Sequence, residues 1–273
     1  MQDKISLAGD LGSGKSTVSK ILIERLGAEY YHTGGLVRAA AEKRGMTIGE
    51  LNVYMETHPE IDKEIDDGLR ALSDVDKFLV IDSRMAWHFV EGTFKIYLST
   101  DIETSSIRIM NAKRECEHSA TLEQTMIDTR ERRVSEKKRY SEKYGVNITD
   151  LSNYSLVVDT SFATPDEIAD CICTSFERWQ ADKSYRGVFL SPERINLPER
   201  EVDEDAVSVL VAKLEMGENI PLPEVLEENG EFYVADGFDS VMAYTLTFST
   251  FVPCVLVGEG KPSGDFVKMK NSL

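Results

Sequence analysis

The residues best suited to chemistry form one run near the start of the chain, Gly9-Asp10-Leu11-Gly12-Ser13-Gly14-Lys15-Ser16-Thr17. The run fits the pattern G-x-x-x-x-G-K-[ST], in which glycines let backbone N–H groups point at phosphate oxygens. Lys15 supplies a point charge for the β- and γ-phosphates, and Ser16 offers a hydroxyl to Mg²⁺. The motif predicts a nucleoside triphosphate site made by Gly12, Ser13, Gly14, Lys15, Ser16 and Thr17.

The flanking segments have the structure that such a loop requires. Residues 4–8 form a strand candidate that leads into the glycines, and residues 15–26 carry apolar side chains at helical spacing. The helix then presents its positive N-terminal end to the phosphates, which strengthens the prediction.

Strands and helices alternate over residues 4–180. Further strands are predicted at 29–31, 78–81, 94–98 and 156–158. Helical segments are predicted at 34–72, with an interruption at His58-Pro59, and at 102–144 and 165–180. This alternation predicts an α/β fold with a parallel sheet flanked by helices. Ligands of such sheets bind at the carboxyl ends of the strands.

Two further candidates follow the strand at 78–81. The carboxylate of Asp82 suits a Mg²⁺ ligand beside Ser16, and Arg84 suits a phosphate on an acceptor, although a surface cation is the alternative for Arg84. Arg38 lies one turn beyond Thr33-Gly34, where it can converge with Arg84 on one acceptor phosphate. The chain has no Asn-Lys-x-Asp guanine-recognition segment, which argues against a GTPase.

A basic cluster runs from Thr129 to Tyr140, within an otherwise acidic chain. Arginines carried by a mobile segment stabilise the charge that develops during phosphoryl transfer. The alternative is a solvated helix face with Glu–Arg pairs three or four residues apart. A P-loop in the same domain favours the first interpretation.

Composition limits the possible partners. The chain has 273 residues, 41% of them hydrophobic, 29% charged, and a formal net charge of -17. An acidic globular chain of this kind repels nucleic acid as a whole, although solubility is the simpler interpretation of its charge. No run approaches the roughly 20 apolar residues of a membrane span, no signal segment precedes the P-loop, and the four cysteines form no CxxC pair. We expect a cytoplasmic protein without nucleic acid or membrane partners.

The pattern changes near residue 183. Short strands are predicted at 188–190, 232–235 and 255–257, around helices at 204–216 and 239–248. We therefore predict a P-loop domain over residues 1–182 and a small α+β domain over residues 183–273.

Residues 1–182 resemble the nucleoside monophosphate kinases, most closely the cytidylate kinases of archaeal type. The resemblance is carried, in order, by the P-loop, Thr33-Gly34-x-x-x-Arg38, Asp82-Ser83-Arg84, the block from Arg130 to Asn147, and Leu156 to Ser161. It implies ATP- and Mg²⁺-dependent phosphoryl transfer to CMP or dCMP. The residues that it implicates are Thr33, Arg38, Asp62 and Arg84 for the acceptor, Ser16 and Asp82 for the metal, and Lys15 and Arg84 with the lid arginines Arg130, Arg132 and Arg139 for catalysis.

Four positions depart from the pattern of these kinases. Asp10 and Leu11 replace small or proline residues of the P-loop, and Asp10 either caps the loop or weakens triphosphate binding. Gly35 replaces an acidic residue, and Ser155 replaces an aspartate expected close to the acceptor sugar. These changes bear on the identity of the substrate.

Residues 183–273 resemble, more loosely, the ParB/sulfiredoxin-like fold, through Leu190-Ser191-Pro192, Pro221 to Val225 and Asp236-Gly237. Active relatives carry His and Arg soon after the Asp-Gly pair, whereas Phe238-Asp239-Ser240 follows here. We interpret this domain as a non-catalytic regulatory or interaction module.

Three hypotheses follow. The leading one is a nucleoside monophosphate kinase that acts on CMP or dCMP. The second is a kinase for another small metabolite, motivated by Gly35 and Ser155. The third is a nucleotide-binding regulatory or adaptor protein that contacts a protein partner through its C-terminal domain, motivated by Asp10 and the appended domain.

Overall fold

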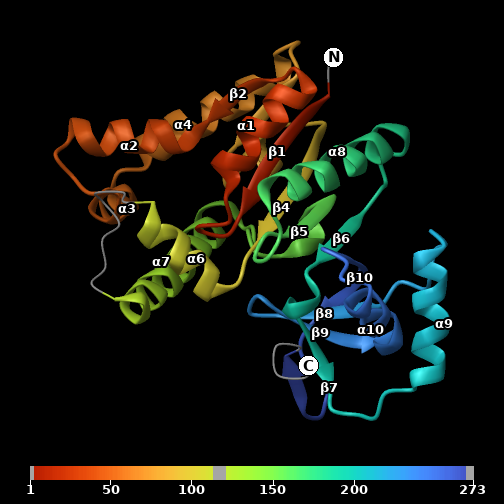
Figure 1. Ribbon diagram of the computed structural model, residues 1–273. Helices are drawn as coiled ribbons and strands as arrows, with labels where there is room; N and C mark the ends of the chain where they lie inside the picture. The colour runs from red at the N-terminus through yellow and green to blue at the C-terminus, as the bar shows by residue number, and fades with distance from the viewer. Residues whose placement is uncertain (1–2, 113–120, 269–273) are drawn as a thin grey trace.

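One sheet runs through the computed structural model, which describes residues 3–112 and 121–268 (Figure 1). Its strand order in the described chain is β11-β7-β9-β8-β10-β6-β5-β4-β1-β3-β2. The strands are β1 (Lys4–Gly9), β2 (Glu29–His32), β3 (Leu79–Asp82), β4 (Thr93–Ser99), β5 (Leu156–Asp159), β6 (Gly187–Leu190), β7 (Ile195–Pro198), β8 (Glu224–Glu228), β9 (Glu231–Asp236), β10 (Val252–Glu259) and β11 (Phe266–Lys268).

Helices connect these strands. They are α1 (Lys15–Leu26), α2 (Thr33–Lys43), α3 (Ile48–Thr57), α4 (Pro59–Ala71), α5 (Ala86–Phe89), α6 (Ile102–Asn111), α7 (Leu122–Tyr144), α8 (Pro165–Ala181), α9 (Glu204–Glu215) and α10 (Phe238–Leu246). Single 3-10 turns cover Leu72–Asp74, Leu151–Asn153 and Pro192–Arg194.

The N-terminal half has the predicted α/β architecture. Strands β2, β3, β1, β4, β5 and β6 pair in parallel, in that order. On one face, Ile5 and Leu7 of β1 share a core with Leu22 of α1 and Phe176 of α8. On the other face, Ala8 belongs to a second core that includes residues of α4 and α5. Burial of both faces explains why these strands are short apolar runs.

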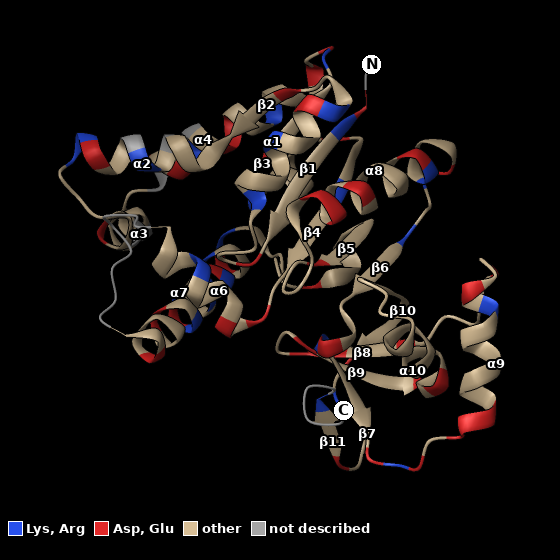
Figure 2. Ribbon diagram, in the orientation of Figure 1, with Lys and Arg blue, Asp and Glu red and all other residues tan. Residues whose placement is uncertain are grey.

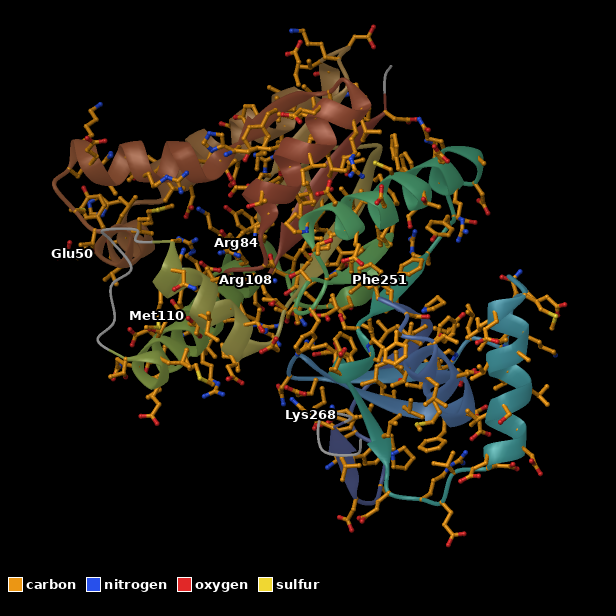
Figure 3. All side chains as sticks on the ribbon, viewed as in Figure 1. Glu50, Arg84, Arg108, Met110, Phe251 and Lys268 are labelled. Carbon is orange, nitrogen blue, oxygen red and sulfur yellow. The ribbon has the colours of Figure 1, made fainter. Side chains whose placement is uncertain are left out.

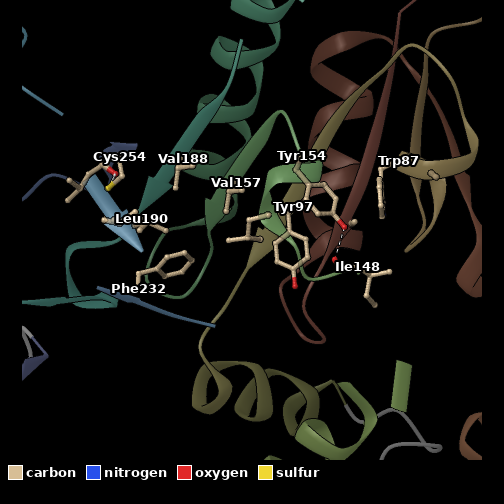
Figure 4. Packing of buried hydrophobic residues seen from close by; sticks show 14 of the residues in the cluster. Trp87, Tyr97, Ile148, Tyr154, Val157, Val188, Leu190, Phe232 and Cys254 are labelled. Carbon is tan, nitrogen blue, oxygen red and sulfur yellow. Dashed lines mark hydrogen bonds between the residues drawn. The ribbon is translucent and has the colours of Figure 1, made fainter. Parts of the chain in front are cut away.

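The C-terminal half continues the same sheet. Strand β6 pairs in parallel with β5 and antiparallel with β10, which joins β8, β9, β7 and β11. Val157 of β5, Leu190 of β6 and Phe232 of β9 belong to a single buried cluster (Figure 4). The predicted boundary at residue 183 falls between α8 and β6, and it remains a prediction as a domain limit.

Two of the expected helical segments are divided. The segment at 34–72 forms α2, α3 and α4, because Gly45 adopts φ +63 after α2 and Thr47 then begins α3 with a capping box. The segment at 102–144 forms α6 and α7, and residues 113–120 lie outside the described chain. Strands β7, β8 and β11 were not predicted.

Candidate active site

The P-loop connects the carboxyl end of β1 to the start of α1. A Cβ at Gly9 would lie 2.3 Å from the carbonyl oxygen of Leu98, and a Cβ at Gly12 would lie 2.6 Å from that of Ser105. Gly12 also has a φ of +68, which disfavours any residue with a side chain. The loop therefore lies directly on β4 and α6, and these contacts fix its shape.

Lys15 points back over this loop. Its Nζ donates to the carbonyl oxygens of Gly9 at 3.1 Å and Asp10 at 2.9 Å. Burial, and to a smaller extent the charge of Arg84, lower the pKa of Lys15 to about 8. The ammonium is thus held where phosphate oxygens could replace the carbonyl oxygens as its partners.

Asp10 turns its side chain into the protein. Its Oδ1 accepts from the Tyr97 hydroxyl at 2.7 Å, and its Oδ2 accepts from the Thr100 N–H at 3.0 Å. Nη2 of Arg133, on α7, lies 3.1 Å from Oδ1. The carboxylate therefore anchors the loop to β4 and α7, which favours the capping interpretation of Asp10.

Arg84 lies between the P-loop and α7 (Figure 3). Its Nη1 donates to the Gly9 carbonyl oxygen at 3.2 Å, and its Nε is 2.9 Å from Glu136 Oε2. Glu136 also pairs with Arg132, at 3.2 Å. Burial acts to lower the pKa of Arg84, but Glu136 and neighbouring groups outweigh it, so the pKa is raised. The predicted residues Lys15, Arg84 and Arg132 are therefore brought together.

The donor atoms near Lys15 fit a magnesium ion. Mg²⁺ is usually held by one or two protein oxygens, with phosphates and waters completing its shell. Ser16, in the first turn of α1, has an exposed side chain. Asp82 ends strand β3, which pairs with β1, and its carboxylate accepts from the Tyr30 hydroxyl at 3.1 Å. One hydroxyl and one carboxylate beside a triphosphate site supply the oxygen chemistry that this ion needs.

The predicted acceptor residues of α2 have different environments. Thr33 is buried at the start of the helix, whereas Arg38 is exposed, with its Nη1 3.6 Å from the position of a Cβ at Gly34. The His32 ring occupies the space that a Cβ at Gly35 would need, 2.2 Å away, and its Nδ1 accepts from the Gly35 N–H. A side chain at position 35 would therefore displace this histidine cap.

Helices α4 and α7 share a polar cluster that includes two predicted residues. Asp62 pairs with Lys143 at 2.6 Å, and the Tyr144 hydroxyl donates to Asp66 at 2.6 Å. Arg139 lies near Asp62, whose charge helps to raise the pKa of Arg139 against the opposing effect of burial. Lys143, Asp66 and Tyr144 were not predicted, but the i, i+4 spacing of Asp62 and Asp66 on one helix face was a usable signal.

The remaining predicted residues lie further out. Arg130 is exposed on α7, where acidic and basic side chains are interspersed (Figure 2). Ser155 precedes β5, at the end of the strand opposite to the P-loop, and accepts from Arg186 at 3.4 Å. The expectation that Ser155 lies close to the acceptor sugar is therefore wrong, because residues at the amino end of a parallel strand face away from such a site.

Arg108, on α6, is a further candidate that the sequence reasoning missed. Its guanidinium donates to the carbonyl oxygen of Thr160 at 2.6 Å and to the hydroxyl of the same residue at 3.2 Å. Thr160 directly follows β5, at the carboxyl end of that strand. Figure 3 labels Arg108. The available signal in the sequence was a basic residue in the helix that follows β4, a strand adjacent to β1.

A glycine loop with its lysine, set between a parallel strand and a helix on an α/β sheet, defines a P-loop nucleotide-binding protein. Within that class the chain belongs to the cytidylate kinase-like family, whose model matches residues 4–162. Family membership supports a nucleotide kinase activity, which implies ATP and a divalent cation. In the described parts of the chain, no helix has the length and apolar character needed to cross a membrane.

One of three similar proteins supports this assignment directly. A cytidylate kinase from Thermoplasma volcanium is 34% identical over 187 residues, covering 67% of this chain and 95% of that protein. An S-adenosylmethionine-dependent nucleotide dehydratase from Lacinutrix mariniflava is 37% identical over 182 residues, covering 66% of this chain but only 37% of its own length. Shikimate kinase from Acinetobacter baumannii covers 64% of this chain and 93% of its own, at 20% identity and a TM-score of 0.43, which is too weak to carry an argument.

Proposed function

We propose that the chain transfers the γ-phosphoryl group of ATP to a nucleoside monophosphate, and that CMP or dCMP is the acceptor. The observation that carries this proposal is that Lys15 and Arg84 donate to the same carbonyl oxygen, that of Gly9, at 3.1 and 3.2 Å. A lysine suited to the donor phosphates and an arginine suited to the acceptor phosphate thus converge on one point.

The reaction places simple demands on these residues. An oxygen of the acceptor phosphate attacks the γ-phosphorus, the bond from that phosphorus to the bridging oxygen breaks, and the electron pair leaves with ADP. Lys15 and Arg84 offset the charge on the transferring group. Mg²⁺, held by Ser16 and Asp82, would neutralise the β- and γ-oxygens. Arg132 is held near Arg84 because both pair with Glu136. A small movement of α7 would therefore bring the charge of Arg132 to the transferring phosphoryl group.

The acceptor side supports a nucleotide. Thr33 begins α2 and Arg38 lies further along the same helix, while Asp62 of α4 pairs with Lys143 of α7. Ionic and hydroxyl groups in these places could bind a phosphate and the polar edge of a base. The cytidylate kinases among the relatives support a cytosine base, and they are the reason that CMP and dCMP are preferred in this proposal.

Acceptor-dependent ADP release, measured across all ribo- and deoxynucleoside monophosphates, tests the proposal. We expect turnover to be fastest with CMP or dCMP. An Arg84→Met variant should lose about a hundredfold in kcat/KM, the scale seen when one group that stabilises transition-state charge is removed. Arg25→Met is the matched control, because Arg25 pairs with Asp166 and Asp170 on the surface. No ADP release with any monophosphate would refute the proposal.

The other two hypotheses predict different results in the same assay. A kinase for another metabolite would show faster turnover with a non-nucleotide acceptor than with CMP. A regulatory or adaptor protein would bind ATP without turnover and would retain a protein partner during purification.

A further inference from the structure

Arg133 connects the P-loop to the C-terminal half of the chain. On one side, its Nη2 lies 3.1 Å from Asp10 Oδ1. On the other side, its Nη1 lies 3.2 Å from the position that a Cβ would take at Gly230, in the turn between β8 and β9. Asp10 raises the pKa of Arg133 most strongly, and Glu227 of β8 adds to the effect. One guanidinium therefore pairs with Asp10 and also lies beside the turn that follows Glu227.

The β8–β9 turn holds Glu227 in place. Asn229 and Gly230 both have positive φ angles, 54 and 87, as in a tight hairpin turn, and the Glu227 carboxylate accepts from the Gly230 N–H. Arg194 donates to the Gly230 carbonyl oxygen at 2.9 Å. Both the N–H and the carbonyl oxygen of Gly230 are therefore hydrogen-bonded, which fixes the turn.

Arg194 in turn fixes the hairpin to the N-terminal half. Its side chain is only 3% exposed, and it pairs at 3.2 Å with Asp159, which is fully buried at the end of β5. A buried pair of this kind is costly to break, because either partner would be left as an uncompensated charge. Glu227 consequently keeps a defined position beside Arg133.

The pair between Arg133 and Asp10 affects phosphate binding, because Asp10 is a negative charge within the P-loop. A carboxylate in a P-loop repels a triphosphate unless a cation offsets it, and the Asp10 side chain is only 6% exposed, so water screens it weakly. Arg133 is that cation. Glu227 attracts the same guanidinium and so draws it away from Asp10.

We propose that Arg133 acts as an electrostatic link through which the C-terminal half tunes triphosphate binding. Arg133 offsets Asp10, so that the P-loop accepts ATP, and Glu227 limits how fully it does so. Arg133 and Glu227 are positioning residues that act through Asp10. The inference rests on the proposed triphosphate site, but it does not depend on the acceptor.

ATP affinity of the full chain, measured by isothermal titration calorimetry, tests the link. Arg133→Met should weaken ATP binding about tenfold, the scale of one unpaired charge several ångströms from the phosphates, and adding Asp10→Asn should restore most of that loss. Glu227→Gln should tighten ATP binding about threefold in the parent chain and have no effect together with Arg133→Met.

Matched controls isolate these charges. Lys138→Met changes an exposed cation of the same helix, and Glu228→Gln changes an exposed carboxylate next to Glu227; both should leave ATP affinity unchanged. The link is overturned if Asp10→Asn fails to rescue Arg133→Met, or if Glu227→Gln acts equally with and without Arg133. If Arg133→Met does not fold, a second comparison tests the link. The gain in ATP affinity caused by Glu227→Gln should be smaller in a chain that also carries Asp10→Asn, because Glu227 acts through Asp10.

The outcomes separate this inference from the proposed function. The variants could change ATP affinity as expected while no monophosphate gives ADP release. That result would refute the kinase activity and leave the link intact. Full kinase activity in Arg133→Met, with unchanged ATP affinity, would refute the link alone.

Discussion

ATP binding should weaken as the pH rises above 8. Burial and the charge of Arg84 lower the pKa of Lys15 from 10.5 to about 8 in the ligand-free protein. A triphosphate attracts the protonated ammonium, so a neutral Lys15 must take up a proton when ATP binds. The protonated fraction falls from about 90% at pH 7 to about 10% at pH 9, so the affinity should fall about tenfold over that range.

Calorimetric titration of ATP with Mg²⁺ from pH 6.5 to 9 measures this change. Titrations at pH 9 in two buffers of different ionisation enthalpy should also report an uptake of about one proton per ATP bound. Binding of CMP alone is the internal control, because Arg84 has a raised pKa and stays charged throughout. An ATP affinity that stays constant up to pH 9, or binding at pH 9 without proton uptake, would show that the pKa of Lys15 is not lowered as the structure indicates.

Three further changes have defined outcomes. Gly12→Ala should abolish measurable ATP binding, because its Cβ would lie 2.6 Å from a backbone oxygen of Ser105; wild-type affinity in a calorimetric titration would contradict this. Phe248→Gly should raise the free energy of unfolding by about 1 kcal/mol in urea denaturation, because Phe248 has a φ of 53 and is 94% exposed; a loss of stability would reveal a contact that its exposure does not indicate. Phe232→Ala should cost about 3–5 kcal/mol by the same method, since Phe232 is 1% exposed in the core that both halves share; a cost below about 1 kcal/mol would show that this core is loosely packed.

The donor half of the site was predictable because short-range features determine it. The glycine spacing and the helix that follows place Lys15, and the apolar run before Asp82 places Arg84 at the end of a strand adjacent to β1. Parallel strands bring their carboxyl ends to one edge, so these two side chains had to lie close together.

The contacts made by α7 were not predictable to the same degree. A charged helix has the same sequence pattern whether its arginines face water or a binding site. Glu136 and Arg133 acquire their roles from Arg84 and Asp10, which lie far away in the sequence. Strand β8 was missed for a related reason: it is mainly acidic, and its pairing with β9 and β10 stabilises it as a strand where its composition does not.

The continuous sheet also leaves little open strand edge. Its two outer strands in the described chain are short, β2 with four residues and β11 with three, and short edges offer little to a second chain. Strand β6 shields the edge of β5, whose four residues are all buried. A chain cut at residue 182 would turn that interior strand into an open apolar edge. We therefore expect a chain cut at residue 182 to aggregate more readily than the full chain.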